Sequence, residues 1–447
     1  MGEYSRPSTE AEFEQNFAPL KPRMNATEAS HESARCLFCY DAPCIAACPT
    51  GIDIPLFIRQ INARDLDGAA KTIYDRNYFG HACGKVCPTK VLCEGACVYN
   101  HQQVKPLEIG RLQAYATSRA IADGKRLHDL APANGKRVAI VGAGPSGIAC
   151  ACELRRLGYA VEVFEAKAVP AGLTLSGVAP YKITDSEVLD EMAYLQAQYG
   201  YAVHYQSPIA TAEAFGRLEA EFDAVFLGIG LGRTRRVGME GEALQGVTGA
   251  TEFIEQLRSL RAGVRIPDRV VVVGGGNTAM DAANESARLG AREVTLAYRR
   301  PRHDMGAYDF EYGLAKGAGV RGLFSVQPLA ILGAARVEGV RFIRTMVVDE
   351  EVREVEGSEF VVPCDMVILA TGQEKQRNIL SLIKGLEFDA GGKVKVNADG
   401  QCTHPRYFAG GDAVSGGAEV VNAAAEGKAA AIGIHKVLFP SMASFPS

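Results

Sequence analysis

The sequence predicts an α/β protein in which a small helical segment is followed by two parallel-sheet domains. Eight of the twelve cysteines fall before residue 100, where apolar residues recur at helical spacing. From residue 136 onward, apolar strands that end in glycine alternate with helical stretches. This alternation is typical of parallel sheets.

The bulk properties exclude several classes of protein. A chain of 447 residues exceeds one ordinary domain, and its hydrophobic content of 47% is that of a soluble globular protein. The net charge of -4 argues against nucleic acid or an anionic membrane as a main partner. Apolar runs such as 270–276 are far shorter than the roughly 20 residues of a membrane helix. The acidic N-terminus lacks a signal-peptide core, so we expect a cytoplasmic, reducing location in which structural disulfides are rare.

The first expected element is a helical domain over residues 1–130 that wraps around whatever the cysteines hold. A polar linker over 122–136 leads from it to the first strand. The apolar residues expected to share one helical face are Ile54, Phe57, Ile58 and Ile61.

The first strand–loop–helix unit carries GAGPSG at 142–147. Gly142 makes the tight turn, Gly144 lets the backbone approach a pyrophosphate, and Gly147 lets the helix pack against the strand. Glu165 ends the next strand, where it can bind ribose hydroxyls. An ordinary tight turn is the alternative, but strand, helix and acid together predict a dinucleotide site. Its expected residues are Gly142, Gly144, Pro145, Ser146, Gly147 and Glu165.

The second unit carries GGGNTA at 274–279, with alanine in the place of the third glycine. The strand that follows ends in two arginines instead of an acid. Guanidinium groups at this position can clamp a 2′-phosphate, which favours NADPH over NADH, although a solvated basic strand end is the alternative. The residues expected to bind the nicotinamide cofactor are Gly274, Gly276, Asn277, Thr278, Arg299 and Arg300.

The two loops are expected to hold different cofactors. A glycine-containing stretch over 170–182 follows the first loop's acid and is suited to lying along an extended cofactor such as FAD. A flavoprotein reduced by a nicotinamide needs two nucleotide domains, whereas a simple dehydrogenase does not. The further residues expected at the flavin, including those of the later ATGQ and GGDAV stretches, are Gly172, Leu173, Lys182, Gly372, Gly411 and Asp412.

The clustered cysteines allow three explanations: a disulfide framework, zinc sites or iron–sulfur clusters. A reducing compartment disfavours the first, and four thiolates would satisfy one zinc ion. Eight thiols in two groups, each with a Cys-Pro, favour two [4Fe–4S] clusters. In ferredoxin runs the cysteine before proline binds the other cluster, which sends Cys48 to the second group. Spacing alone then offers Cys83 as the fourth ligand of the first group.

Iron–sulfur clusters and a nicotinamide site imply a flavin between them. NADPH delivers two electrons as a hydride and a cluster carries one, and a flavin connects the two kinds of step. Such a chain feeds electrons to something else. The adjacent Cys150 and Cys152 lie in a predicted helix as packing residues, which argues against a disulfide reductase.

These motifs follow one another along nearly the whole chain: CLFCYDAPCIAACPTGIDIPLFIRQI, CGKVCPTKVLCEGAC, IGRLQ, GAGPSG, GGGNTAMD, ATGQ and GGDA. In this combination the chain resembles the electron-input part of dihydropyrimidine dehydrogenase, which in bacteria is a separate, PreT-type subunit. The small subunit of glutamate synthase is similar. The DAPC and IGRLQ stretches favour the dihydropyrimidine dehydrogenase branch.

The resemblance implies a fold and a set of cluster ligands. It implies two Rossmann-like domains, with an NAD(P)H domain over 245–363 inserted into an FAD domain made of 131–244 and 364–447. It also implies a glutamine ligand, which replaces Cys83 in the expected assignment. That assignment gives Cys36, Cys39, Cys44 and Gln113 to one cluster and Cys48, Cys87, Cys93 and Cys97 to the other.

The resemblance further implies a function. Hydride from NAD(P)H would pass to FAD, and single electrons would pass through two [4Fe–4S] clusters to a partner subunit. In the favoured interpretation the partner carries FMN and iron–sulfur clusters and reduces uracil or thymine. The alternatives are the glutamate synthase small subunit and a flavin-less binding or assembly module. No catalytic residue is predicted.

Overall fold

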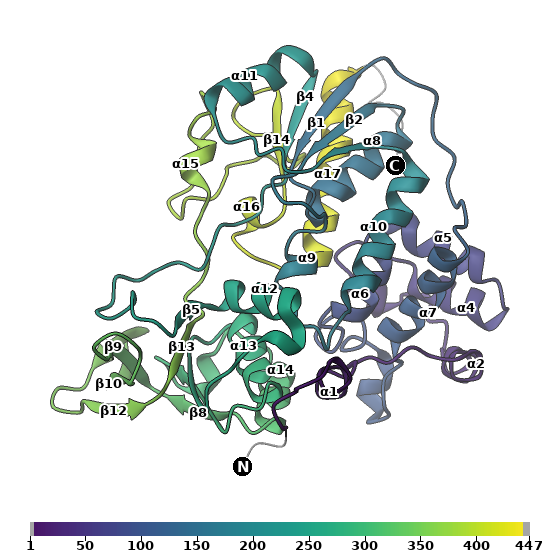
Figure 1. Ribbon diagram of the computed structural model, residues 1–447. Helices are drawn as coiled ribbons and strands as arrows, with labels where there is room; N and C mark the ends of the chain where they lie inside the picture. The colour runs from purple at the N-terminus through teal and green to yellow at the C-terminus, as the bar shows by residue number, and fades with distance from the viewer. Residues whose placement is uncertain (1–3, 441–447) are drawn as a thin grey trace. The chain divides into compact units, whose positions relative to one another are not determined.

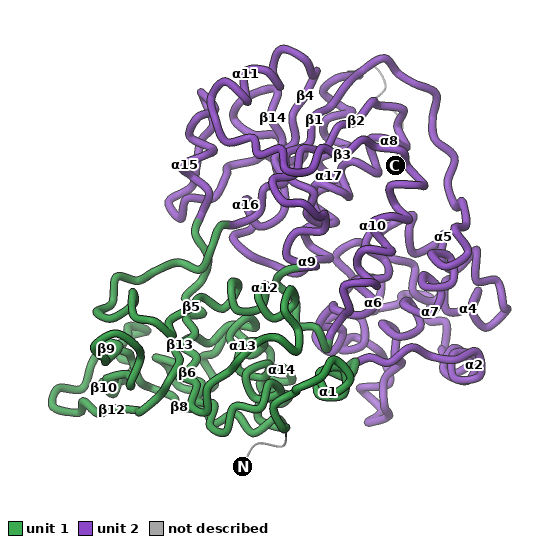
Figure 2. The backbone as a smooth tube through the Cα atoms, viewed as in Figure 1, with its two compact units in different colours: residues 1–20, 176–181, 232–374 green, residues 21–175, 182–231, 375–447 purple. Residues whose placement is uncertain are grey.

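The computed structural model describes residues 4–440. The chain forms two compact units (Figure 2). Unit 1 contains the described residues up to Leu20, together with 176–181 and 232–374. Unit 2 contains 21–175, 182–231 and the described residues from 375 on. Unit 1 is thus inserted into unit 2, and the predicted fold class is confirmed.

Unit 2 contains a five-stranded parallel sheet with strand order β14-β4-β1-β2-β3 (Figure 1). Because β1 and β4 are central, their side chains are almost all buried, as continuous apolar strands of a parallel sheet should be. The strands are β1 Arg137–Val141, β2 Ala160–Phe164, β3 Ala202–His204, β4 Ala224–Leu227 and β14 Tyr407–Ala409. The helices that follow them or connect them are α8 Pro145–Arg156, α9 Leu173–Ser176, α10 Asp185–Tyr199, α11 Ala212–Glu221, α15 Arg377–Leu380, α16 Asp412–Ser415 and α17 Val420–Leu438.

The cysteine-rich part of unit 2 is helical, as predicted. The four apolar residues expected on one face are buried in its core, and cysteine side chains pack against that core. Gly84 and Gly110 let two of the helices approach closely, since a Cβ on Gly84 would lie 2.8 Å from the Gly110 carbonyl oxygen. The helices are α2 Ala26–Ala34, α3 Pro43–Ala46, α4 Ile54–Asn62, α5 Leu66–Arg76, α6 Gly80–Val86, η1 Val98–Gln102 and α7 Ile109–Ala122.

Unit 1 contains a second five-stranded parallel sheet, with strand order β5-β13-β6-β7-β8. The sequence did not predict its second, antiparallel sheet, in which β10 pairs with β9, β11 and β12. The parallel strands are β5 Val247–Gly249, β6 Arg269–Val273, β7 Glu293–Tyr298, β8 Arg321–Phe324 and β13 Met366–Leu369, and the antiparallel strands are β9 Val326–Leu332, β10 Gly339–Val348, β11 Glu351–Glu354 and β12 Phe360–Pro363. The helices are α1 Glu10–Asn16, α12 Ala250–Leu260, η2 Arg261–Gly263, α13 Asn277–Arg288, η3 Arg302–Asp304 and α14 Asp309–Gly317.

The unit boundaries differ from the expected domain boundaries in two ways. The inserted unit runs from 232 to 374 instead of 245 to 363, because β13 pairs with β6 of the second sheet. The cysteine-rich helices form one unit with the first sheet. Helix α1 instead belongs to unit 1, and the rings of Phe13 and Phe17 stack in the core of that unit with their centroids 4.3 Å apart. None of the described helices is long and apolar enough to cross a membrane.

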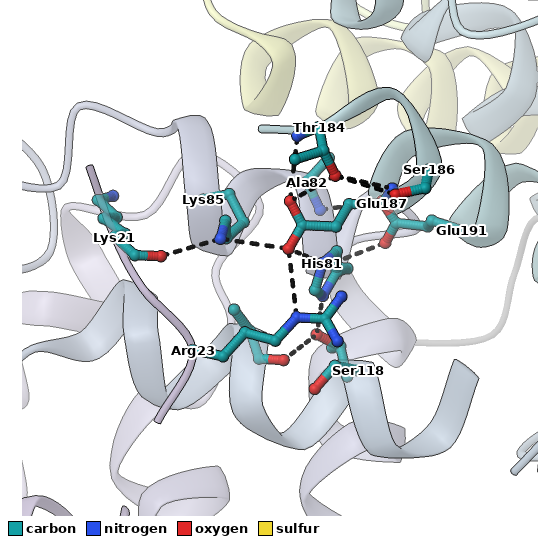
Figure 3. A network of polar contacts seen from close by, with 12 residues as sticks. Lys21, Arg23, His81, Ala82, Lys85, Ser118, Thr184, Ser186, Glu187 and Glu191 are labelled. Carbon is teal, nitrogen blue, oxygen red and sulfur yellow. Dashed lines mark hydrogen bonds and ion pairs between the residues drawn. The ribbon is translucent and has the colours of Figure 1, made fainter. Parts of the chain in front are cut away.

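A buried carboxyl group joins the cysteine-bearing helix α6 to α10 (Figure 3). Glu191 of α10 is completely buried and accepts hydrogen bonds from the backbone nitrogens of His81 (2.6 Å) and Ala82 (2.9 Å). The Tyr74 hydroxyl donates a third at 3.1 Å. These backbone donors belong to the first turn of α6 and have no partner within the helix. Glu191 therefore supplies the hydrogen-bond acceptors for the first turn of α6, although it lies far from that helix in sequence.

A second carboxylate of α10 extends this network. Glu187 pairs with the buried Lys85 of α6 at 3.2 Å and with Arg23 at 3.3 Å, as Figure 3 shows. Lys85 also donates to the Lys21 carbonyl oxygen at 2.9 Å. Burial opposes ionisation of Glu187, but hydrogen bonds with His81 and the charge of Lys85 hold its pKa well below the usual range. The ionised pair fixes the other end of α6.

We predict that Glu191→Gln destabilises unit 2 by about 2–3 kcal/mol, because an amide replaces one of the two acceptor oxygens with an NH2 group that faces a backbone donor of α6. Urea unfolding of the purified protein, followed by far-UV circular dichroism because the chain lacks tryptophan, measures this free energy. Asp190→Asn is the control, since Asp190 lies on the exposed face of the same helix and should change stability by less than about 0.5 kcal/mol. Equal effects of the two substitutions would contradict the prediction.

Candidate cofactor-binding sites

The first glycine loop connects β1 to α8 and has the shape that a pyrophosphate requires. Gly142 has a φ of 103°, and a Cβ there would lie 2.4 Å from the Gly228 carbonyl oxygen. A Cβ on Gly147 would lie 2.0 Å from the Gly142 carbonyl oxygen, so this glycine closes the helix onto the loop. Gly144 differs, because its nearest neighbour would be 3.9 Å away. Open space at Gly144, at the start of α8, is where phosphates can approach the helix N-terminus.

Glu165 is held directly beside this loop. Its carboxylate accepts hydrogen bonds from the backbone nitrogens of Ala143 and Lys167, both at 2.7 Å. A carboxylate has about four acceptor positions, so these bonds orient Glu165 and still leave capacity for ribose hydroxyls. The residues present therefore fit an adenosine nucleotide such as FAD.

Two other segments of unit 2 pack against the same loop. The Ala171 nitrogen donates to the Ala143 carbonyl oxygen at 2.8 Å, and a Cβ on Gly172 would lie 3.1 Å from the Gly144 Cα. A Cβ on Gly411 would lie 2.7 Å from the Ser146 hydroxyl oxygen. Of the remaining residues expected at the flavin, Leu173 begins α9, Asp412 begins α16 and Lys182 is buried in unit 2, whereas Gly372 belongs to unit 1.

Asp412 and Glu426 form a half-buried acidic pair near the end of β14. Glu426 of α17 accepts a hydrogen bond from the Gly411 nitrogen at 2.6 Å, and Asp412 accepts one from the Ala418 nitrogen at 3.1 Å. Burial raises the pKa of both carboxyl groups, and Asp412 adds to the effect at Glu426. The sequence analysis did not identify Glu426, because it lies inside an alanine-rich helix without a motif.

The second glycine loop, in unit 1, connects β6 to α13. Gly274 has a φ of 153°, and a Cβ there would lie 2.5 Å from the Ala370 carbonyl oxygen. Gly276 precedes Asn277 and Thr278 at the start of α13 and has no neighbour that a Cβ would meet within 4 Å. The second loop thus resembles the first: close packing requires one of its glycines, and the other faces open space.

Arg299 and Arg300 follow β7, the strand next to this loop in the sheet. Arg299 is exposed and Arg300 half-buried, and neither forms an ion pair with a carboxylate among residues 4–440. Arg300 instead donates to the Glu350 carbonyl oxygen at 3.3 Å. Two cations without carboxylate partners suit the 2′-phosphate of NADPH.

All twelve cysteines are free thiols, and the eight near the N-terminus form two sets in unit 2. Cys36, Cys39, Cys44 and Cys97 line one apolar pocket together with residues of α3, α4 and η1. Burial raises the pKa of Cys44 to about 12, and the thiols of Cys36 and Cys97 add to the effect. Four thiols facing one apolar pocket fit a [4Fe–4S] cluster, whose iron would replace the protons of these groups.

The second set contains Cys48, Cys83, Cys87 and Cys93. A hydrogen bond with Cys83 raises the pKa of Cys87. Burial and charge repulsion from Cys83 and Cys48 raise it further. Burial, Glu94 and the thiols of Cys87 and Cys48 raise the pKa of Cys93. Within the described residues, no three His, Cys, Asp or Glu side chains form a preformed site for a single metal ion.

This grouping differs from the expected one at two residues. Cys97 lies with Cys36 in the first set, because the chain after Cys97 forms η1 beside the first turn of α4. Gln113 faces α6, which leads into Cys87, and its side-chain nitrogen donates to the Gly80 carbonyl oxygen at 2.6 Å. Among residues 4–440 its amide oxygen accepts no hydrogen bond, so it is available as a ligand. The grouping of side chains in the structure thus differs from the expected partition at Cys97 and Gln113.

Two cations near the cysteine sets were not anticipated either. Lys21 lowers the pKa of the Cys87 and Cys93 thiols, against the larger effect of burial, and Arg59 does the same at Cys36. Lys21 lies in an irregular segment and Arg59 in a helix, both distant in sequence from the thiols that they affect. Lys21 lies outside the sequence motifs, and Arg59 lies in the stretch that follows the first cysteines but has no local signal of a site residue.

Comparison with known proteins places the chain in a family. Residues 136–427 match the pyridine nucleotide-disulphide oxidoreductase family. Residues 13–125 match a family described as dihydropyrimidine dehydrogenase domain II, 4Fe-4S cluster. The chain belongs to the pyridine nucleotide-disulphide oxidoreductase family. It is therefore an oxidoreductase that carries an additional iron–sulfur domain.

Relatives of this oxidoreductase cover nearly its whole length. It is 35% identical over 444 residues to the glutamate synthase [NADPH] small chain of Escherichia coli (strain K12), covering 94% of this chain and 93% of the relative. It is 30% identical over 426 residues to the NAD-dependent dihydropyrimidine dehydrogenase subunit PreT of the same organism, covering 95% and 98%. FprA of Mycobacterium tuberculosis, solved in complex with NADPH, matches with a TM-score of 0.57 and 19% identity over 71% of this chain and 87% of FprA, which shows the shared fold. The resemblance inferred from the motifs is confirmed.

In this oxidoreductase we predict opposite effects at two glycines of the first loop. Gly144→Ala should change the free energy of unfolding by less than about 0.5 kcal/mol, because its methyl group meets no other protein atom closely. It should weaken FAD binding about tenfold or more, because that methyl group enters the space expected for the pyrophosphate. Gly147→Ala should destabilise the protein itself by about 1–3 kcal/mol, because its Cβ meets backbone. Flavin content and urea unfolding separate the two outcomes. Full flavin occupancy in Gly144→Ala would be inconsistent with this site.

We predict the iron content of four variants from the two cysteine sets. The iron content of Cys97→Ala and of Gln113→Ala should fall towards about half of the roughly eight irons expected for two clusters, because each substitution removes a ligand. Cys83→Ala should keep its iron, since three thiols and Gln113 complete the second set. Cys402→Ala, buried away from both sets, is the control. Loss of iron in Cys83→Ala with retention in Gln113→Ala would reverse the assignment.

Proposed function

We propose that this chain takes hydride from NAD(P)H and delivers single electrons to a partner subunit through FAD and two [4Fe–4S] clusters. The observation that carries the proposal is that one compact unit contains both the first glycine loop and both cysteine sets, while a second unit carries its own glycine loop. A bound flavin would accept a hydride and return electrons one at a time, which is the step that joins nicotinamide and cluster chemistry.

The proposed roles of the chain's residues follow from their environments. Gly144 and Glu165 would hold the FAD pyrophosphate and ribose, and Gly276 would receive the nicotinamide cofactor. Arg299 and Arg300, exposed or half-buried without carboxylate partners in the described chain, favour NADPH. The other proposed contacts are those expected from the sequence, with Gly372 the weakest because it belongs to unit 1.

The proposed ligands follow the observed grouping of the cysteines. Cys36, Cys39, Cys44 and Cys97 would hold the first cluster. Cys48, Cys87, Cys93 and Gln113 would hold the second, since Gln113 has an amide oxygen without a hydrogen bond from the described residues. Most thiols of the two sets are half-buried, and the buried Cys83 would remain a packed thiol beside Cys87.

Two partners are candidates for receiving the electrons. The DAPC and IGRLQ stretches favour a subunit that carries FMN and reduces uracil or thymine. The higher identity to a glutamate synthase small chain, 35% against 30% for PreT, favours a subunit that forms glutamate, and that relative is named as NADPH-dependent. An intact glycine loop and eight grouped thiols argue against a flavin-less binding module.

We predict that the protein purified anaerobically contains about one FAD and about eight irons and reduces ferricyanide or viologen with NADPH faster than with NADH. Alone, it should not reduce uracil or form glutamate, because the pyrimidine or amide chemistry belongs to the partner. Reconstitution with a pyrimidine-reducing subunit and, separately, with a glutamate synthase large subunit identifies the acceptor. Uracil turnover by the single chain, or the absence of flavin and iron, would refute the proposal.

A further inference from the structure

Each cysteine set has one cation beside it that lacks a carboxylate partner. Among residues 4–440, neither Lys21 nor Arg59 forms an ion pair. By contrast, Lys85 and Arg23, the other cations near α6, share the carboxylate of Glu187. The half-buried Lys21 is the less expected of the two, because an ionised side chain is most stable near an opposite charge or in water, whereas Arg59 is exposed to water.

Lys21 points its ammonium group at the backbone of the second set. Its Nζ lies 3.1 Å from the Cys87 carbonyl oxygen and 3.4 Å from the Gly84 carbonyl oxygen. Gly110 makes room for it, since a Cβ there would lie 3.2 Å from Nζ. Lys21 is half-buried, so solvent screens its charge only partly.

Arg59 has the corresponding position at the first set. Its guanidinium lies over the ring of Phe38 at 4.8 Å, and Phe38 lies between Cys36 and Cys39 in sequence. The α4 helix that carries Arg59 also supplies Ile54 to the wall of the pocket. Arg59 is exposed, so salt screens its charge more strongly than that of Lys21.

We propose that Lys21 and Arg59 are positioning residues that separately set the reduction potentials of the two clusters, Lys21 that of the second and Arg59 that of the first. The inference rests on the proposed function, because it requires both clusters to be present. Reduction adds one negative charge to a cluster, and a nearby cation stabilises that charge. Each cation therefore makes its own cluster easier to reduce and acts little on the other.

The competing explanation is that Lys21 only satisfies carbonyl groups at the end of α6, as lysines commonly do at helix C-termini. Lys21→Gln separates the two roles, because its amide can still donate a hydrogen bond but carries no charge. Lys21→Arg keeps the charge and serves as the conservative variant. Arg59→Gln and Arg59→Lys form the matched pair at the other set.

The experiment is a reductive titration of the loaded protein at low salt, with each cluster followed by electron paramagnetic resonance. Lys21→Gln should lower the reduced-to-oxidised ratio of one cluster about tenfold at a fixed potential, that is by about 59 mV for a one-electron couple. Arg59→Gln should shift the other cluster, by a smaller factor that shrinks as salt is added. The charge-conserving variants should titrate as the wild type. Iron content and flavin-dependent ferricyanide reduction serve as readouts of the proposed function itself.

The pattern of shifts decides the inference. Movement of different clusters by the two neutral variants supports it. A shift in the potential of the same cluster in both variants, a shift in neither cluster, or an equal shift in Lys21→Arg overturns it. Full iron and flavin content in these variants would still leave the proposed function intact. If Lys21→Gln loses iron, the Arg59 pair decides: a shift confined to one cluster supports the inference and no shift overturns it.

Discussion

The first turn of α6 depends on one buried carboxyl group. Glu191 accepts two backbone hydrogen bonds there, and the Lys85–Glu187 pair holds the other end of the same helix against α10. Helix α6 leads directly into Cys87, so these contacts fix a cysteine backbone relative to the sheet that carries the first glycine loop. In a low-dielectric interior such bonds are strong when complete and costly when broken. These bonds join α6 to α10 within unit 2 and restrain the backbone that leads into Cys87.

The partial burial of the cysteine side chains bears on the assembly of the proposed clusters. Burial raises the pKa of Cys44 and Cys93, so these thiols are protonated when no iron is bound. Cluster assembly must displace those protons, and its free energy therefore adds directly to the stability of the helical segment. The charge of the half-buried Lys21 acts on these thiols more strongly than it would in open solvent, because solvent screens it only partly. The burial of the cysteine side chains therefore affects both the free energy of the proposed cluster assembly and the reduction potentials of the proposed clusters.

The sequence predicted those features that a local pattern determines. A strand, a glycine loop and a helix in succession located both glycine loops, and helical spacing identified Phe57 and Ile58 as core residues. Features that depend on the path of the chain escaped it. The strand over 366–369 is equally apolar in either sheet, and only its pairing with β6 assigns it to unit 1. Cys97 and Gln113 are separated from their neighbours by loops whose course no spacing rule encodes. The grouping of side chains in the structure, and the ligand sets proposed from it, therefore differ from the expected sets at these two residues.

The exchange changes the electrostatics of the two cysteine sets. On the proposed assignment the first cluster has four thiolate ligands, whereas the second has three thiolates and a neutral amide. The second cluster then carries one negative charge fewer, and the half-buried Lys21 offsets a further part of what remains. Glu94, whose carboxylate accepts a hydrogen bond from the Gly110 nitrogen at 3.0 Å, acts in the opposite direction near Cys93. On that assignment, ligand type and nearby charge together would make the second cluster the easier one to reduce, so an electron that reached the first cluster would move towards the second.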